Sequence, residues 1–402
     1  MKPVINKTSK TILEDNKISI AIMSSFAILT LQYLILIYFN LIGTPSAYRI
    51  QLISKIVVGF FYIIALPTVL RRNKFKFLAV FFISIFIFLL NFLLFNENWI
   101  FLKDVIFPYF FTCLPSLIYS YSISDWNVLE SVMKKTSLLV FIIGSIIGIL
   151  VFSNRASIGT YSMAFSYYML LPTIVHIDEF LEKFTFKSIF VVSVSLIIIL
   201  ALGSRGAILC VGVFVILKLV QMGKKLSYKT IFIYVIILFL IATFLLLFDT
   251  ILQNLYDFLL QFGIRSRSIA LFLRDDVHLS GRDRLYEDMI QEILDNPVFG
   301  IGLAGDRRVI GGYSHNIFIE VISDFGIIIG GILVLVLAII SYQTLFSQNK
   351  MLSNFIVIWF CIGAVSLMVS GSYLTEFKFW IFLGLAIKSL RTSKKQILKS
   401  LN

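Results

Sequence analysis

Long apolar runs dominate the chain and predict membrane-spanning helices. A helix needs about 20 mostly apolar residues to cross the hydrocarbon layer, and backbone groups left unpaired in lipid cost several kcal/mol each. On this basis we predict twelve spans, the last two separated by very few residues. They cover approximately residues 18–39, 51–70, 77–95, 103–121, 136–153, 159–176, 187–203, 206–221, 230–249, 325–343, 353–371 and 374–389.

The polar stretches between these runs indicate which side of the membrane each loop occupies, because short cytoplasmic loops are enriched in Lys and Arg. With the N-terminus in the cytoplasm, the basic stretches all fall on the cytoplasmic side: RRNKFK (71–76), Lys134 and Lys135, GKK (223–225) and RTSKK (391–395). The first apolar run is too long for a signal-peptide core and is not followed by a small-residue cleavage site, so we expect it to be retained. Both termini are therefore predicted to be cytoplasmic.

The same orientation places the one long hydrophilic segment, residues 250–314, on the extracytoplasmic side. The predicted fold is an all-α integral membrane protein of about twelve transmembrane helices. A large, partly helical extracytoplasmic loop lies between the ninth and tenth helices. We expect residues 1–402 to form a single polytopic membrane domain.

The composition agrees with a membrane protein and excludes other classes. The chain is 59% hydrophobic and 14% charged, whereas ordinary globular domains carry about 25% charged residues. A net charge of +13 could indicate a nucleic-acid partner, but the side of the membrane on which the cations fall explains it. The three cysteines all lie within apolar runs, which argues against a disulfide framework, a thiolate metal site or redox chemistry.

The extracytoplasmic segment is unusual in its cations, because it contains seven arginines and no lysine. These are Arg265, Arg267, Arg274, Arg282, Arg284, Arg307 and Arg308. One explanation is pairing with the acidic residues of the same segment on a solvated face. The other is that the planar guanidinium group suits phosphate.

Residues 280–297 are predicted to form an amphipathic helix. Ser280 can cap it, Asp283 supplies the acid three residues later, and Asn296 and Pro297 end it. The expected apolar face is formed by Leu285, Met289, Ile293 and Leu294. Such a helix would hold Arg282 and Arg284 near lipid headgroups, and the free amides of its first turn would favour an anion.

The stretch GIGLAG (300–305) matches the pattern of a dinucleotide-binding loop. That function needs a buried strand before the glycines and a helix directly after them, but only Val298 and Phe299 precede them and DRRVIGGY follows. The loop also faces away from the cytoplasm, where nicotinamide cofactors are available. We therefore interpret these glycines, with Gly311 and Gly312, as giving backbone freedom to a loop that folds back over the membrane.

Two further residues are candidates for chemistry. His315 lies in SHN, ahead of IFIEVISDFGIIIGG, which predicts a short helix leading into the tenth span. A histidine pKa near 6.5 suits proton abstraction, although a lone histidine can also serve only in hydrogen bonding. Arg205 lies in LGSRGAIL at a helix start, where it could anchor the helix among headgroups or face a lipid-linked phosphate on the same side as residues 250–314.

Three motifs follow one another in a specific order: SRGA (204–207), GRDRLYEDMIQEILDNPVFGIGLAG (281–305) and SHN (314–316). Together they resemble the family of O-antigen ligases and of O-antigen and capsular polysaccharide polymerases. The resemblance covers about residues 204–331. It implies a fold of about twelve helices in which residues 250–314 form a catalytic loop.

The resemblance implies a glycosyltransferase at the outer face of the bacterial cytoplasmic membrane. Such an enzyme moves a glycan from undecaprenyl diphosphate to an acceptor sugar hydroxyl, with inversion and without a nucleotide, metal or other cofactor. Arg205 and Arg282 would bind the diphosphate, and His315 would be the general base. The weaker candidates for substrate contacts are Arg284, Arg307, Arg308 and Asn316. The implied partners are the lipid-linked oligosaccharide, the acceptor glycan and membrane lipids, with a chain-length regulator as an optional further partner.

Several functions remain open at this point. Within the family, a polymerase joins repeat units, whereas a ligase moves finished chains to lipid A core or another final acceptor. We favour the polymerase, because abundant Ile, Phe and Lys is typical of proteins from polysaccharide clusters. From other classes, a lipid-linked sugar flippase or transporter would use intramembrane charges such as Lys55 and Lys218, and a non-enzymatic scaffold would tolerate alanine at Arg205, Arg282 and His315.

Overall fold

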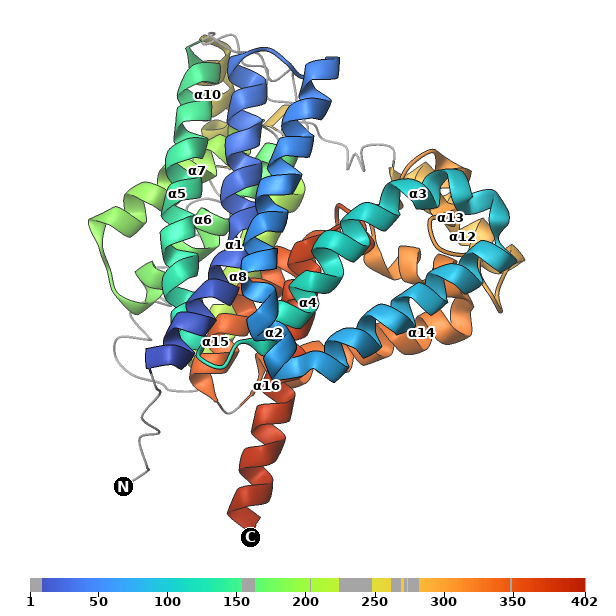
Figure 1. Cartoon of the computed structure of the whole chain (residues 1–402). Helices are drawn as coiled ribbons and strands as arrows, with labels where there is room; N and C mark the ends of the chain where they lie inside the picture. The colour runs from blue at the N-terminus through green and yellow to red at the C-terminus, as the bar shows by residue number, and fades with distance from the viewer. Residues whose placement is uncertain are drawn as a thin grey trace. The chain divides into compact units, whose positions relative to one another are not determined.

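The structure is a computed structural model, and it describes residues 9–153, 163–202, 204–223, 248–261, 269–270, 273, 282–347 and 349–401. Every regular element within these ranges is helical (Figure 1). The first eight α-helices are α1 (Ser9–Tyr38), α2 (Pro45–Leu94), α3 (Trp99–Pro108), α4 (Leu114–Ser122), α5 (Trp126–Phe152), α6 (Met163–Glu182), α7 (Phe186–Leu202) and α8 (Arg205–Gly223). They are followed by α10 (Phe248–Gln261), α12 (Arg282–Asp295), α13 (Gly305–Ile310), α14 (Ile317–Leu345), α15 (Lys350–Trp359) and α16 (Phe377–Leu401). Three shorter elements are η1 (Asn96–Asn98), η2 (Tyr109–Cys113) and η3 (Phe360–Val365).

Six of these helical segments are long and apolar enough to cross a membrane, which makes the chain a multi-pass helical membrane protein. They are Ser9–Tyr38, Pro45–Leu94, Asn96–Ser122, Trp126–Phe152, Arg205–Met222 and Ile317–Leu345. The other predicted spans also coincide with helices, except for the ninth, residues 230–249, which lies almost wholly outside the described residues. The total of twelve crossings therefore stays a prediction.

The predicted loop between the second and third spans is a kink between two helices. We expected the basic stretch RRNKFK to separate these spans. The helix α2 is continuous in trace over Pro45–Leu94, but Asn73, within this stretch, has a non-helical φ of −144° and ψ of 36°, so two helices meet there (Figure 1). The Asn73 side chain donates a hydrogen bond of 2.9 Å to Ser122 Oγ in α4, which holds the bend in place.

The chain divides into two compact units. Unit 1 comprises Met1–Met23, Gly59–Val132 and Leu279–Asn402, and unit 2 comprises Ser24–Val58 and Met133–His278. In unit 1, α16 packs against α4 and η3, while α14 packs against α12, α13 and α15. In unit 2, α6 packs against α7 and α8. The two ion-rich regions described below both lie in unit 1.

The tenth predicted span shows why the structure suits a lipid environment. As expected, α14 begins as a short helix and then bends, at Gly326, into a longer one. The longer part leaves a row of large apolar side chains exposed: Ile327, Ile328, Ile329, Ile332, Leu333, Leu335, Val336 and Ile339. A surface of this kind is stable when lipid, not water, covers it.

Candidate active site

The glycine-rich stretch docks on the bend of α14. The backbone N–H of Ile301 donates to Ser323 O at 2.7 Å, and that of Ile327 donates to Pro297 O at 2.8 Å. These bonds satisfy backbone groups that the break in α14 would leave unpaired. Gly326 makes the break possible, because its φ of +76° and ψ of 171° belong to a region that is essentially restricted to glycine.

Two glycines of the supposed dinucleotide pattern allow close backbone packing. Gly300 has a φ of +69°, and a Cβ there would collide with the backbone of Ser323 and Gly326. Gly302 has a φ of +77°, and a Cβ there would collide with the Phe95 ring and with Asn91 Oδ1. A helix, α12, precedes these glycines where a dinucleotide fold needs a strand. The need for glycine is therefore confirmed at Gly300 and Gly302, and Gly311 also has a positive φ. Contrary to our expectation, a short helix, α13, follows the glycines directly and includes Gly305.

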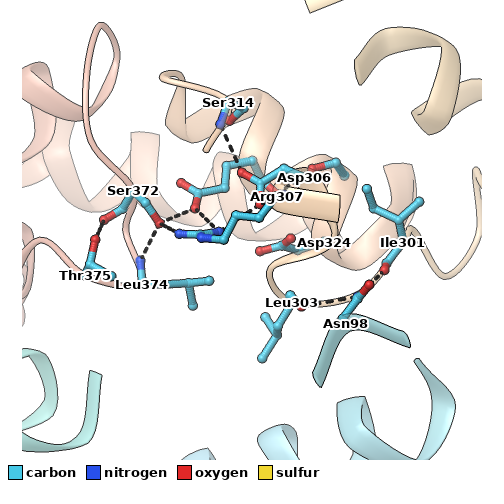
Figure 2. Close-up of polar contacts among 12 residues, drawn as sticks. Asn98, Ile301, Leu303, Asp306, Arg307, Ser314, Asp324, Ser372, Leu374 and Thr375 are labelled. Atoms are coloured by element: carbon cyan, nitrogen blue, oxygen red, sulfur yellow. Dashed lines mark hydrogen bonds and ion pairs between the residues drawn. The ribbon is translucent and has the colours of Figure 1, made fainter. Parts of the chain in front are cut away.

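Two asparagines of unit 1 fix the same loop from the other side. Asn98 Nδ2 donates to the backbone oxygens of Ile301 at 2.8 Å and Leu303 at 3.3 Å (Figure 2). The N–H of Leu303 donates to Asn91 Oδ1 at 2.6 Å. Asn91 and Asn98 are themselves buried. The loop that leads into α13 is thus held rigidly by α2 and η1.

Arg307 of α13 lies inside the protein. Its side chain is only 12% exposed, and its guanidinium donates to Asp306 Oδ1 and to Ser372 Oγ, both at 2.8 Å (Figure 2). Glu320 Oε1 lies 3.8 Å from the same group. The guanidinium group of Arg307 therefore already has two carboxylates and one hydroxyl as partners within the protein.

The partners of Arg307 connect three segments of unit 1. Glu320, in the short first part of α14, accepts a hydrogen bond from the Ser372 hydroxyl and one of 3.1 Å from the N–H of Tyr373. The Tyr373 hydroxyl donates to Asp324 Oδ2 at 2.7 Å. Trp380 Nε1 of α16 donates to Tyr373 O at 2.7 Å. The network fixes the start of α14 against the loop before α16.

This network contains more acid than base. Three buried carboxyl groups, Asp306, Glu320 and Asp324, gather around one guanidinium group. Burial raises the pKa of Asp306, although Arg307 and the backbone N–H of Ser314 act against that rise. For Arg307, burial lowers the pKa, but the neighbouring acids outweigh burial and raise it overall. Arg307 therefore stays charged and bound to its internal partners.

His315 is held directly beside this network. The N–H of Ser314 donates to Asp306 Oδ2 at 3.0 Å, and the Asn316 side chain caps α14 by accepting from the N–H groups of Phe318 and Ile319. Between them, His315 adopts a φ of +59°, which few non-glycine residues adopt. Its conformation is fixed by the neighbours on both sides.

The environment of His315 keeps its ring neutral. Burial, and then the positive charge of Arg282, lower the pKa of His315 from 6.5 to about 4. Its ring centroid lies 4.3 Å from that of Tyr313. Its Nδ1 atom is buried and has no hydrogen-bond partner within the described residues. A neutral imidazole with a free ring nitrogen can accept a proton, but a pKa of about 4 makes it a weaker base than an ordinary histidine, whose pKa near 6.5 is closer to neutral pH.

Arg282 is the first residue of α12, a helix that forms as expected and ends at Asp295, directly before Asn296 and Pro297. The charge of Arg282 acts on both His315 and Tyr313, so the structure brings these three residues together. Arg284 lies two residues further on and is exposed. The expected cap, Ser280, lies outside the described residues.

The apolar face of α12 is narrower than predicted. Met289 is fully buried, and Leu285 and Ile293, one helical turn to either side, are partly buried. Leu294, which we expected on the same face, is 61% exposed. The reason is geometric, since residues four apart share a helix face and adjacent residues do not.

The other predicted residues take separate positions. Arg308 is exposed, with its guanidinium 3.7 Å from Glu97. Arg205 is the first residue of α8 in unit 2, directly after the buried Ser204. Arg265, Arg267 and Arg274 lie outside the part of the chain that the structure describes.

Sequence reasoning missed three residues of the site, namely Glu320, Ser372 and Tyr313. The pKa of Tyr313 is raised, first by burial and then by the charge of Glu376, while a hydrogen bond with Ser370 acts against the rise. A usable signal for one of the three was present, because Glu320 and Asp324 are spaced four apart in an otherwise apolar stretch. Acids at that spacing share a helix face and need internal partners.

The fold and the site thus define a polytopic helical membrane protein with a histidine just before the spanning helix α14 and an arginine at the first residue of α12 whose charge acts on that histidine. Residues 190–330 match the family model described as O-antigen ligase. The matched segment contains Arg205, Arg282 and His315, and it supports an activity of the O-antigen ligase or polymerase type on a lipid-linked glycan and an acceptor. No curated protein and no solved structure shows a significant match.

Proposed function

We propose that the protein is a polysaccharide repeat-unit polymerase that acts at the outer face of the bacterial cytoplasmic membrane. It transfers a glycan from undecaprenyl diphosphate to an acceptor sugar hydroxyl, with inversion and without a metal. The observation that supports glycan transfer is the buried Nδ1 of His315, which has no hydrogen-bond partner among the described residues and lies within reach of the charge of Arg282. The family match over residues 190–330 supports the reaction type.

In the proposed reaction, His315 is the general base. The acceptor hydroxyl attacks the anomeric carbon, its proton passes to the free imidazole nitrogen, and the bond from that carbon to the diphosphate oxygen breaks. A positioned general base contributes about 10²–10⁴-fold to a rate. Because its pKa is about 4, His315 is unprotonated before the reaction at neutral pH.

Arg282 and Arg205 are proposed to bind the diphosphate and to offset the charge that grows on it as it leaves. Arg282 starts α12, so the unpaired amides of the first helical turn add to its attraction for an anion. We prefer Arg282 to Arg284, because the charge of Arg282 lowers the pKa of His315, whereas Arg284 is exposed. Arg284 and Arg308 are exposed and are kept as candidates for sugar contacts.

Arg307 and Asn316 enter the proposal as positioning residues. The Arg307 fork is occupied by Asp306 and Ser372, and the Asn316 side chain caps α14. Both interactions hold the residues around His315. Their substitution should lower activity through a displaced base, with a loss of stability at the same time.

The alternative within the family is a ligase that transfers finished chains to lipid A core or another final acceptor. The same base and the same arginines serve both reactions. The alternative from another class, a lipid-linked sugar flippase, would use intramembrane charges. One of these charges, Lys218 of α8, is buried and paired with Asp178, with Nζ and Oδ1 2.5 Å apart.

The test is complementation of a deletion strain, followed by gels of surface and lipid-linked polysaccharide. The variants are His315→Gln, Arg282→Gln and Arg284→Gln, with Arg49→Gln, an exposed arginine at the start of α2, as the control. We expect His315→Gln and Arg282→Gln each to reduce transfer by about 10²-fold or more. Arg284→Gln should have a smaller effect, and Arg49→Gln none.

The chain lengths on each carrier then separate the candidates. Single repeat units on the surface carrier identify a polymerase, whereas long chains that persist only on the lipid diphosphate identify a ligase. Membrane levels of each variant are measured alongside. A normal ladder from well-expressed His315→Gln would rule out His315 as the base and favour the flippase.

A further inference from the structure

A second ion-rich region of unit 1 lies at the bend of α2, apart from the proposed active site. It is a cavity of about 300 Å³ between α2, α4 and α16. Its lining residues are Arg72, Asn73, Lys76, Tyr121, Lys388, Arg391 and Thr392. Four of these side chains are cationic and none is acidic. The cavity is at the lower end of the size range of small-molecule sites, about 300–1,000 Å³.

Three of the cations converge on one neutral side chain, Tyr121. Lys76 donates to the Tyr121 hydroxyl and also lies 4.1 Å from its ring centroid. Arg391 donates to the same hydroxyl at 2.7 Å, and Lys388 Nζ lies 5.3 Å from the ring centroid. A tyrosine can attract cations through its ring and its oxygen, but it does not neutralise them.

The charge of the fourth cation, Arg72, is compensated by two acidic side chains. Its guanidinium binds Asp15 Oδ1 at 2.5 Å and Glu14 Oε2 at 3.1 Å, and it also donates to Ser122 O. In the described ranges of the chain, Lys76, Lys388 and Arg391 form no ion pair with a carboxylate. Lys388 is half-buried among these charges, and although Tyr121 attracts it, the charges of Lys76, Arg72 and Arg391 repel it. An anion in the cavity would remove this repulsion.

We propose that the cavity binds a phosphate group, supplied by the headgroup of an anionic phospholipid. Arg and Lys side chains form strong charge-assisted hydrogen bonds with phosphate, and basic pockets between helices on the cytoplasmic side bind such headgroups. Large apolar side chains beside the cavity are exposed on the same helices, namely Phe75, Leu78, Phe82 and Ile387. The cations would hold the phosphate, and these apolar residues would contact the acyl chains.

The predicted orientation fits this source. RRNKFK and RTSKK supply Arg72, Lys76 and Arg391, and both stretches are expected at the cytoplasmic surface. The lipid would thus bind on the opposite side from the proposed glycan transfer. It would fasten the bend of α2 to α16 by neutralising the cations of both helices.

The test uses the purified full-length chain in a neutral detergent. Binding of short-chain phosphatidylglycerol is measured by native mass spectrometry for the wild type and for Lys76→Gln, Lys388→Gln and Arg391→Gln. The matched control is Lys74→Gln, which removes the same charge two residues from Lys76 at an exposed position that does not line the cavity. We expect each cavity variant to bind about tenfold more weakly, as loss of one charge-assisted hydrogen bond predicts, and Lys74→Gln to bind like the wild type.

Two further ligands separate the sources of phosphate. Phosphatidylcholine carries no net charge and should bind at least about tenfold more weakly than phosphatidylglycerol. Inorganic phosphate tests whether the natural ligand is a soluble phosphate. If the wild type binds inorganic phosphate tightly and the cavity variants do not, the cavity is a phosphate site, but its ligand is not a lipid. Equal binding of phosphatidylglycerol to the wild type and all variants would overturn the proposal. Melting temperatures without ligand verify that each variant is folded.

Discussion

Unit 1 contains two ion-rich clusters with opposite charge balance. The acid-rich cluster consists of Asp306, Arg307, Glu320, Asp324 and Ser372, and its single guanidinium is surrounded by carboxyl groups. The cation-rich cluster is the cavity around Tyr121, where Lys76 and Arg391 both donate to the tyrosine hydroxyl and Lys388 lies near its ring. This difference indicates which cations are available to bind a ligand. An arginine whose guanidinium group already binds internal acceptors stabilises the fold, whereas cations that form no ion pair with an acid remain available to bind an anion.

The largest effect is expected from Arg307→Met. This change leaves Asp306 and Glu320 buried without their cation, and breaking a buried pair in this way costs about 3–5 kcal/mol. Thermal unfolding in detergent should therefore show a large drop in melting temperature. The double variant Arg307→Met/Asp306→Asn removes one uncompensated acid and should recover part of the loss. If Arg307→Met leaves the melting temperature unchanged, the acid-rich cluster does not stabilise the fold.

A smaller effect is expected from Gly326→Ala at the bend of α14. The backbone there is essentially restricted to glycine, which alone costs an alanine about 1–3 kcal/mol, and the new Cβ would meet Val298 O. Gly331→Ala in the same helix is the control, since a Cβ there meets no atom within 4 Å. Because alanine favours a helix interior, the control should gain about 0.5–1 kcal/mol. Effects of opposite sign would confirm the role of the bend, and a loss in both variants would contradict it.

The two clusters also differ in how far the sequence could predict them. Apolar runs locate the spans because period and length are local properties, and α12 followed from its spacing of Leu285, Met289 and Ile293. The charge balance around Arg307 was not accessible, because its partners Ser372 and Glu320 come from distant segments. Likewise, Tyr121 and Arg391 are far apart in sequence. RRNKFK does separate two helices, but charge alone does not reveal that they are joined by a kink at Asn73 and not by a loop.

An intermediate effect on stability is expected from the titration of His315. This residue lies beside the acid-rich cluster, but its pKa is lowered by burial and by the charge of Arg282. Above about pH 6.5 the imidazole is neutral in both the folded and the unfolded chain, so it adds no pH dependence. Between about 6.5 and about 4 only the unfolded chain takes up the proton, so stability falls with falling pH; below about 4 both states are protonated and the loss stops. The measurement is the melting temperature of the wild type relative to His315→Gln from about pH 7 to pH 4.

We expect the melting temperature of the wild type to fall relative to that of His315→Gln as the pH is lowered from about 6.5 to about 4. The same low pKa predicts that glycan transfer keeps its unprotonated base well below pH 6.5. A difference that stays constant with pH would mean that Arg282 and burial do not lower the pKa of His315.

The smallest change in stability is expected from Arg391→Gln, measured without added lipid. This substitution removes a hydrogen bond to Tyr121, which destabilises the fold, but it also removes repulsion on Lys388. The two effects oppose each other, so the melting temperature should move little, within the roughly ±0.5 kcal/mol typical of surface changes. Phosphatidylglycerol should then raise the melting temperature of the wild type more than that of Arg391→Gln, because ligand that binds only the folded state stabilises it according to its affinity. A large loss without lipid would show that Tyr121 alone satisfies these cations, and the contrast between the two clusters would disappear.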